Sequence, residues 1–363
     1  ARGGQAAPEA LHAPLLAYPA TFCFITCVIV AIYGHRGAGV VIRVMVYLMA
    51  LATMKLTVKW VFVEYAFRFP KFVTGFHFLC SGLVCALVRL RSRAQEGSAP
   101  IAVPTSAEFL AMILPISLAT SVSVGADNMA LGFSSVAFTE ILGSTTCICT
   151  VGMVIFMGLP FNKWLLIPCL AVAMGCAISA EGEVNASVPG MLLVFLANAA
   201  RSTKATFQQK LMTGESRDRF DPCTLLMWVS VPSTLLMFSS SLLFEGLAPM
   251  RRMAAMDKSA LGGLLLAILA SCVNAVILNL SQLFVTKDLG AVGGQLVGQA
   301  KAVLTVLGGM ALFGDSVTKL EVIGFAEVLL GVYTFSWMEG RSKRAEKKCE
   351  EPPKAEAEPA SRA

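Results

Sequence analysis

The sequence predicts an all-α polytopic membrane protein whose core is ten helices arranged as two inverted five-helix repeats. Its composition indicates a membrane protein, because 56% of the 363 residues are hydrophobic and only 14% are charged. About a quarter of the residues of a soluble domain are charged. The apolar residues fall in runs near the length needed to cross a bilayer. A weak internal repeat relates the two halves of the chain.

Ten apolar runs form the expected core, and a further run at 15–33 precedes them. This first run has three readings: an additional retained helix, a signal anchor, or a signal peptide that is removed. The ten core runs, in chain order, are 41–63, 71–90, 109–131, 134–158, 164–180, 190–212, 223–244, 261–286, 290–313 and 319–338.

These runs divide the chain into three regions. Residues 1–40 form an N-terminal segment, and residues 41–340 form the membrane domain, with halves at about 41–185 and 186–340. The last region, 341–363, is rich in Lys, Glu, Pro and Ala. Such a composition cannot bury enough apolar surface to fold, so we expect a disordered charged tail.

The loop charges predict the orientation in the membrane. With the C-terminus in the cytosol, fifteen lysines and arginines face the cytosol and six face the opposite side. Short loops rich in Lys and Arg stay in the cytosol, so we expect a cytosolic tail and a luminal loop at 181–187. The basic residues do not gather on one aromatic-studded face, so the sequence predicts no nucleic-acid partner.

The internal repeat relates residues 141–158 to residues 296–314. With five helices in each half, the second half is inverted relative to the first. Inverted repeats are typical of transporters that hold their solute at the repeat interface. Three aligned pairs share one offset of 155 residues: Gly143 with Gly298, Thr150 with Thr305, and Val151 with Val306.

Lys301 is the strongest functional signal in the chain. It is the only charged residue in the apolar run 289–313. A charge at bilayer depth is costly and usually faces a cavity or a partner, and an anionic solute is the simplest partner for an ammonium group. The alternative reading is a lysine that snorkels to the membrane interface.

The sequence offers no support for an enzyme or for a cofactor. It contains no Walker loop, no catalytic triad arrangement and no metal-ligand cluster. Its 11 cysteines are scattered, mostly inside apolar runs, and are interpreted as small buried hydrophobes.

Short motifs in a fixed order reveal a family. Between about residues 43 and 338 the chain resembles the triose-phosphate and nucleotide-sugar transporter group of the drug/metabolite transporter superfamily. The resemblance implies ten helices, an inverted repeat, and exchange of organic phosphates or nucleotide sugars for a counter-substrate. The motifs are Lys59-Trp60, Phe69-Pro70 with His77, Leu114-Pro115 through Asn128, SSVAFTEILGS at 134–144, Gln208-Gln209-Lys210-Leu211, Phe244-Glu245-Gly246, Gly298-Gln299-Ala300-Lys301 and Phe313-Gly314-Asp315.

Two departures from the family favour its endomembrane branch. Plastid phosphate translocators carry a lysine where this chain has Gly143, and an arginine where it has Ala302. The resemblance therefore favours the endomembrane branch, whose solutes are nucleotide sugars or are unassigned. Plastid-envelope exchange of triose, hexose or pentose phosphates stays an alternative.

The candidate substrate-binding residues are basic and polar groups inside the predicted helices. The resemblance implies that Lys301 meets the substrate phosphate and that Lys204 occupies a second basic position. Arg201 lies one turn from Lys204, so both could reach one anion from the same helix face. Glu140 is a candidate counter-ion for Lys204 or Lys301, unless it faces the luminal loop. Gln299 and Asn128 are weaker candidates, since amides inside membranes more often join helices. Lys55 is a further candidate for the cavity, because it lies deeper in its helix than Lys59, one turn away.

The sequence thus predicts a secondary antiporter of nucleotide sugars or phosphorylated sugars in a Golgi or ER membrane. Its expected partners are the lipid bilayer, the anionic solute and a counter-substrate. A transport-inactive scaffold is the alternative from another functional class. The oligomeric state, including a homodimer, stays open.

Overall fold

The computed structural model describes residues 26–96, 101–130, 133, 139, 142–179, 187–213, 220–300 and 318–350. Within these ranges the chain is helical apart from short connections, and it contains no strand. The principal helices are α2 (Ala38–Glu64), α3 (Pro70–Glu96), α5 (Leu114–Ala130), α7 (Thr146–Phe156), α8 (Leu166–Ser179), α9 (Val188–Met212), α10 (Pro222–Phe244), α12 (Lys258–Gln299) and α14 (Lys319–Glu350). The shorter helical pieces are 26–33, η1 (Gly34–Arg36), α4 (Ser106–Glu108), η2 (Phe109–Ile113), η3 (Lys163–Leu165) and α11 (Ala248–Ala254).

The composition and surface of these helices fit a bilayer. Among the described residues, five helical segments are long and apolar enough to cross a membrane, and three shorter helices are also apolar. Large apolar side chains such as Leu87, Phe156 and Leu243 point outward and are mostly exposed. So much apolar surface would be costly in water and is expected against lipid tails. The predicted class, a helical membrane protein, is therefore confirmed. The five long segments are Pro70–Gln95, Ser106–Asp127, Pro222–Phe244, Lys258–Gln299 and Val322–Ser342.

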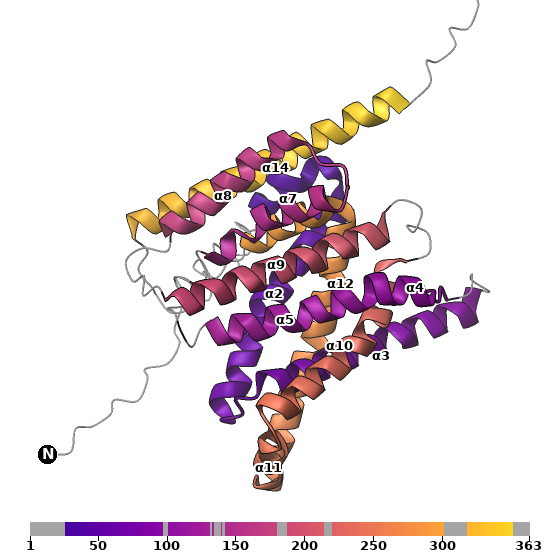
Figure 1. The fold of residues 1–363 in the computed structure, drawn as a ribbon, viewed down its shortest axis with the longest axis vertical. Helices are drawn as coiled ribbons and strands as arrows, with labels where there is room; N and C mark the ends of the chain where they lie inside the picture. The colour runs from indigo at the N-terminus through magenta and orange to yellow at the C-terminus, as the bar shows by residue number, and fades with distance from the viewer. Residues whose placement is uncertain are drawn as a thin grey trace, which may run out of the picture.

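The helices pack in pairs that join distant parts of the chain. α2 runs along α12, α5 along α9, α3 along α10, and α8 along α14. Figure 1 shows α8 beside α14 at one side of the molecule and α3 beside α10 at the other. α7 packs against both α9 and α12. Because each pair joins the first half of the chain to the second, the space between the pairs lies at the interface of the halves.

A kink divides α12 at Gly290, near the gap that the sequence predicts between its eighth and ninth core helices. Gly290 has φ +74°, a left-handed conformation that a residue with a Cβ rarely adopts. The carboxamide oxygen of Gln209, at the end of α9, accepts a hydrogen bond of 2.7 Å from the backbone N–H of Ala291. This bond satisfies a backbone donor that the kink would otherwise leave unpaired.

Ion pairs join several helices at the end of the molecule predicted to be cytosolic. The guanidinium of Arg43 binds Asp288 on α12 at 2.7 Å, and the guanidinium of Arg36 binds Glu339 on α14 at 2.9 Å. At the opposite end, the carboxylate of Glu245 accepts hydrogen bonds from the backbone N–H groups of Lys71 and Phe72. That carboxylate stabilises the N-terminal end of α3.

The two ends of the chain extend the sequence-based picture. Residues 26–33, the last part of the predicted first run, are helical, whereas residues 15–25 lie outside the described residues. α14 continues to Glu350, so ten residues that we assigned to a disordered tail are helical. Residues 351–363 lie outside the description.

Candidate functional site

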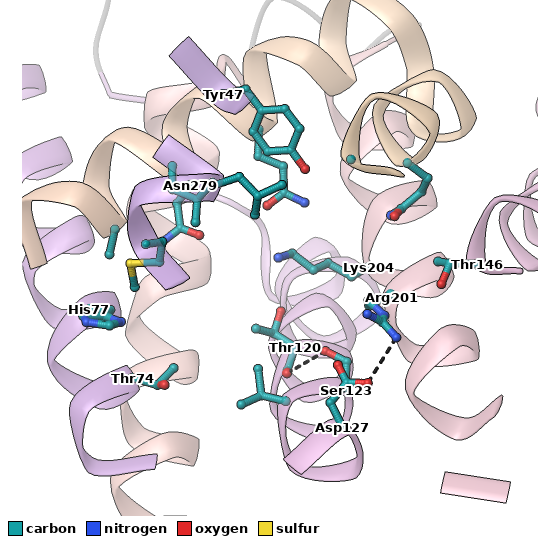
Figure 2. Close-up of a pocket in the computed structure, with 18 of the residues that line it drawn as sticks. Tyr47, Thr74, His77, Thr120, Ser123, Asp127, Thr146, Arg201, Lys204 and Asn279 are labelled. Carbon is teal, nitrogen blue, oxygen red and sulfur yellow. Dashed lines mark hydrogen bonds and ion pairs between the residues drawn. The ribbon is translucent and has the colours of Figure 1, made fainter. Parts of the chain in front are cut away.

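A central cavity of about 330 Å³ lies between the helix pairs. It receives side chains from α2, α3, α5, α7, α9 and both parts of α12 (Figure 2). Most of its polar lining consists of hydroxyl and amide groups, to which the described residues add two cations and one carboxylate. The charged and most polar residues in the lining are Tyr47, Thr74, His77, Thr120, Ser123, Asp127, Thr146, Arg201, Lys204, Asn279, Gln282, Gln295 and Gln299.

Lys204 on α9 supplies a cation without a counter-ion among the described residues. The helix that carries it, α9, begins at Ser187, whose hydroxyl accepts a hydrogen bond from the N–H of Gly190. Small buried residues along α9 hold the helix in the interior and so position Lys204. Figure 2 shows the Lys204 side chain reaching into the middle of the cavity. Within the described part of the chain its ammonium group has no hydrogen-bond or ion-pair partner. A desolvated ammonium in this position attracts anions strongly.

Arg201 lies one turn earlier on α9 and is held by its neighbours. Its guanidinium donates to Asp127 on α5 at 3.1 Å and to the side-chain oxygen of Asn198 at 2.8 Å. Figure 2 shows Arg201 turned toward Asp127 and away from the direction of Lys204. The two cations therefore serve different parts of the cavity, and Lys204 has the freer charge.

Asn198 fixes this arrangement from a fully buried position. Its carboxamide oxygen accepts hydrogen bonds from Thr146 at 2.8 Å and from Arg201, and its NH₂ group donates to the carbonyl of Leu142 at 2.7 Å. The Asn198 side chain thereby connects α9 to α7 and to the turn before α7, and it also holds the Arg201 guanidinium. A buried amide with several partners gives a rigid local structure.

The second part of α12 closes another side of the cavity. The NH₂ group of Gln299 lies 3.5 Å from the carbonyl oxygen of Gly143, at the outer limit of a hydrogen bond. Gly298 faces the hydroxyl of Tyr47, because a Cβ at this glycine would lie 3.3 Å from that oxygen. The predicted fourth and ninth core helices therefore approach each other beside the cavity.

The predicted site residues divide into two groups. Lys204, Arg201 and Gln299 line the cavity together. Lys301 and Glu140 lie outside the described residues, and Asn128 and Lys55 are described only as backbone positions in α5 and α2. The proposed pairing of Glu140 with a lysine thus stays a prediction, as do the roles of the other three.

Sequence reasoning overlooked Asp127 and Tyr47. Asp127 is the only charged residue in the run 109–131, so the argument applied to Lys301 would have singled it out as well. Tyr47 carries no comparable signal, because an aromatic residue in an apolar run is ordinary. The described residues contain no cluster of histidine, cysteine and acidic groups able to hold a metal ion.

The comparison that decides the family is a match over most of the chain. The model of the Triose-phosphate Transporter family matches residues 38–336. The chain belongs to this family. The family assignment made from the ordered motifs is therefore confirmed, and a transporter function follows at the level of the family.

Two of three relatives of this triose-phosphate transporter family member are named for a solute, and the third is named for a solute carrier family. A probable sugar phosphate/phosphate translocator of Arabidopsis thaliana is 26% identical over 78% of this chain and 90% of its own length. Solute carrier family 35 member E4 of Rattus norvegicus is 25% identical over 82% of this chain and 80% of its own. UDP-uronic acid transporter 1 of Arabidopsis thaliana is 25% identical over 79% of this chain and 89% of its own.

A solved structure agrees at the level of the fold. One crystal structure superposes with a TM-score of 0.61 and covers 84% of this chain and 99% of that chain. The two sequences are 13% identical, so this likeness concerns the fold alone.

Proposed function

We propose that the protein is a secondary antiporter that exchanges a nucleotide sugar or a phosphorylated sugar for a counter-substrate by alternating access. The observation that carries this proposal is Lys204, a cation with no counter-ion among the described residues, in a polar cavity between the two halves of the chain. Ammonium–phosphate contacts are strong in such a place because they are charge-assisted and water competes poorly.

The pairing of the helices supports a ten-helix core of two inverted repeats. Numbered as predicted, α2 and α12 form a pair of the first and eighth helices, and α5 and α9 a pair of the third and sixth. An exchange of the two halves converts one of these pairs into the other. It also maps the pair of α3 and α10, and the pair of α8 and α14, onto themselves. Solutes of inverted-repeat transporters bind where the repeats meet.

In this proposal Lys301 adds a second phosphate contact from the ninth core helix. The cavity lining includes Gly298 and Gln299, which lie three and two residues before Lys301 in the sequence. Gln299 donates hydrogen bonds to the solute, and the amide of Asn128 and the ammonium of Lys55 serve as further solute contacts. Glu140 holds a lysine in the empty state.

The cations also explain why exchange dominates over leak. An empty carrier would carry buried cations without a compensating anion while it changes conformation, which costs free energy. A bound anion removes that cost, so the switch proceeds readily only when a solute or a counter-substrate is present.

We place the protein in a Golgi or ER membrane, with its C-terminal tail in the cytosol. The absence of the two plastid-type cations at Gly143 and Ala302 supports an endomembrane over a plastid envelope. The excess of basic residues on the tail side supports the orientation.

Counterflow into liposomes tests the proposal. Purified protein is reconstituted, and uptake of radiolabelled UDP-sugars, GDP-mannose and hexose phosphates is compared between empty and preloaded vesicles. We expect at least one solute to enter preloaded vesicles much faster. Equal uptake into empty and preloaded vesicles would rule out obligatory exchange, and no uptake of any solute would favour the inactive scaffold.

A further inference from the structure

The central cavity has two chemically different ends. Lys204 reaches into the middle of the cavity. One end of the cavity holds the hydroxyl of Tyr47 and the amide of Asn279. The other end holds the ion pair of Asp127 and Arg201, beside the hydroxyl-bearing residues Thr120 and Ser123. The charge at that end is nearly balanced, whereas the charge at Lys204 is not balanced by any described residue.

A carboxylate in an anion-binding cavity requires an explanation. Asp127 and Arg201 have partly exposed side chains, at 39% and 32%, so both are accessible from the cavity. If Arg201 served the substrate phosphate, the phosphate would lie close to the Asp127 carboxylate, and the like charges would repel. If a hydroxyl-rich group lay there, its O–H groups could donate to the carboxylate and its oxygens could accept from the guanidinium.

We propose that Asp127 and Arg201 form a subsite for the uncharged, hydroxyl-rich end of the solute, and that Asp127 excludes a second phosphate from that end. The inference rests on the proposed function, because it takes Lys204 as the group that meets the phosphate. The solute then lies with its phosphate at Lys204 and its sugar hydroxyls against α5. Asp127 is in this account a residue that determines specificity by charge.

Asp127 could instead act only by holding Arg201 in place. In that case its loss would weaken the binding of all solutes by a similar factor. If Asp127 selects by charge, its loss changes a ratio of affinities. The ratio compares a solute that has a neutral group at this end with a solute that has a charged group there. The ratio therefore separates the two roles.

Two matched solute pairs measure this ratio. Glucose 6-phosphate and glucose 1,6-bisphosphate differ by a phosphate at the end remote from the first, and UDP-glucose and UDP differ by replacement of the hexose with a charged terminus. Affinities are measured by calorimetry on purified full-length wild type and on Asp127→Asn. Asparagine has nearly the same shape and can still accept the hydrogen bond from Arg201. The control is Asp288→Asn, which removes an arginine-paired carboxylate that does not line the cavity.

We expect the wild type to prefer the member with the neutral end in at least one pair. Asp127→Asn should shift that ratio at least about tenfold toward the charged member, while Asp288→Asn and Asp127→Glu should retain the wild-type ratio. If Asp127→Asn does not fold, Asp127→Ser, which removes the same carboxylate and leaves Arg201 in place, should shift the ratio in the same direction.

Three results would overturn the inference. An unchanged ratio in Asp127→Asn, or an equal shift in Asp288→Asn, would refute the subsite and leave the transporter function intact. A wild type that binds each charged solute as tightly as its neutral partner would likewise refute the subsite, and the counterflow assay would still decide the transporter function.

Discussion

At the scale of single residues, the protein separates charges that the sequence alone would group together. Arg201 and Lys204 lie one turn apart, and their spacing suggested a shared anion. The structure instead commits Arg201 to Asp127 and Asn198 and leaves Lys204 directed into the cavity. The sequence could not predict this outcome, because the partner of Arg201 comes from α5, which meets α9 only in the folded chain.

Lys301→Ala should abolish exchange while the protein remains folded and correctly located. The ammonium group supplies charge for the phosphate in the proposed mechanism, so its removal costs the contact and the coupling together. Lys301→Arg should retain little activity, because the guanidinium is bulkier and differently hydrated. The measurement is counterflow at matched protein content, and wild-type rates in Lys301→Ala would mean that the lysine is structural.

Asn198→Ala should lower the free energy of unfolding by about 1–3 kcal/mol, because it removes the buried hydrogen bonds by which Asn198 joins Thr146 and the carbonyl of Leu142 to α9. Thr203→Ala is the control on the same helix, since the hydroxyl of Thr203 bonds only its own helix backbone among the described contacts. Thermal melting in detergent compares the two variants. Equal melting temperatures would contradict the role given to Asn198.

At the scale of elements, apolar runs predicted the helices well because a bilayer imposes both length and composition. The break near Gly290 was also anticipated, since the charged Lys287 and Asp288 interrupt the apolar pattern there. The close approach of α8 and α14 was not predicted. It depends on small residues facing one another from distant parts of the chain: a Cβ at Gly175 would lie 2.7 Å from the carbonyl oxygen of Gly324.

Gly175→Ala should therefore destabilise the protein by about 1–3 kcal/mol, because the new methyl group meets backbone atoms that cannot move aside without separating the helices. Gly152→Ala is the matched control in α7, where a Cβ meets nothing within 4 Å. There the change should be neutral or slightly stabilising. Melting temperatures of the two variants test this, and a smaller loss for Gly175→Ala than for Gly152→Ala would contradict the packing argument.

At the scale of the whole molecule, the sequence predicted the class and the family, and it predicted part of the site. The family could be predicted because its short motifs occur in the expected order. Candidate functional positions such as Lys301 could be predicted because a charge in an apolar run is unusual. The cavity itself depends on which helices pair, and no local pattern encodes pairing. Asp127 was missed for a different reason. An anionic solute suggests cations as its partners, although an acid in an equally apolar run is just as unusual.

The orientation gives a prediction for the whole chain. In sealed microsomes, protease should remove an epitope placed after Arg341 and spare one placed in the loop 181–187, because the basic residues favour a cytosolic tail. Detergent-opened microsomes are the control, in which both epitopes should be cleaved. A protected tail would reverse the orientation.

The most direct test of the central claim is the trans-stimulated exchange rate of Lys204→Ala in liposomes. Lys210→Ala removes an exposed lysine at the end of the same helix and serves as the matched control. The account predicts that Lys204→Ala loses at least about tenfold in exchange, a loss of one charge-assisted contact or more, whereas Lys210→Ala exchanges at close to the wild-type rate. Wild-type exchange by folded Lys204→Ala would show that Lys204 does not bind the phosphate and would contradict the central claim.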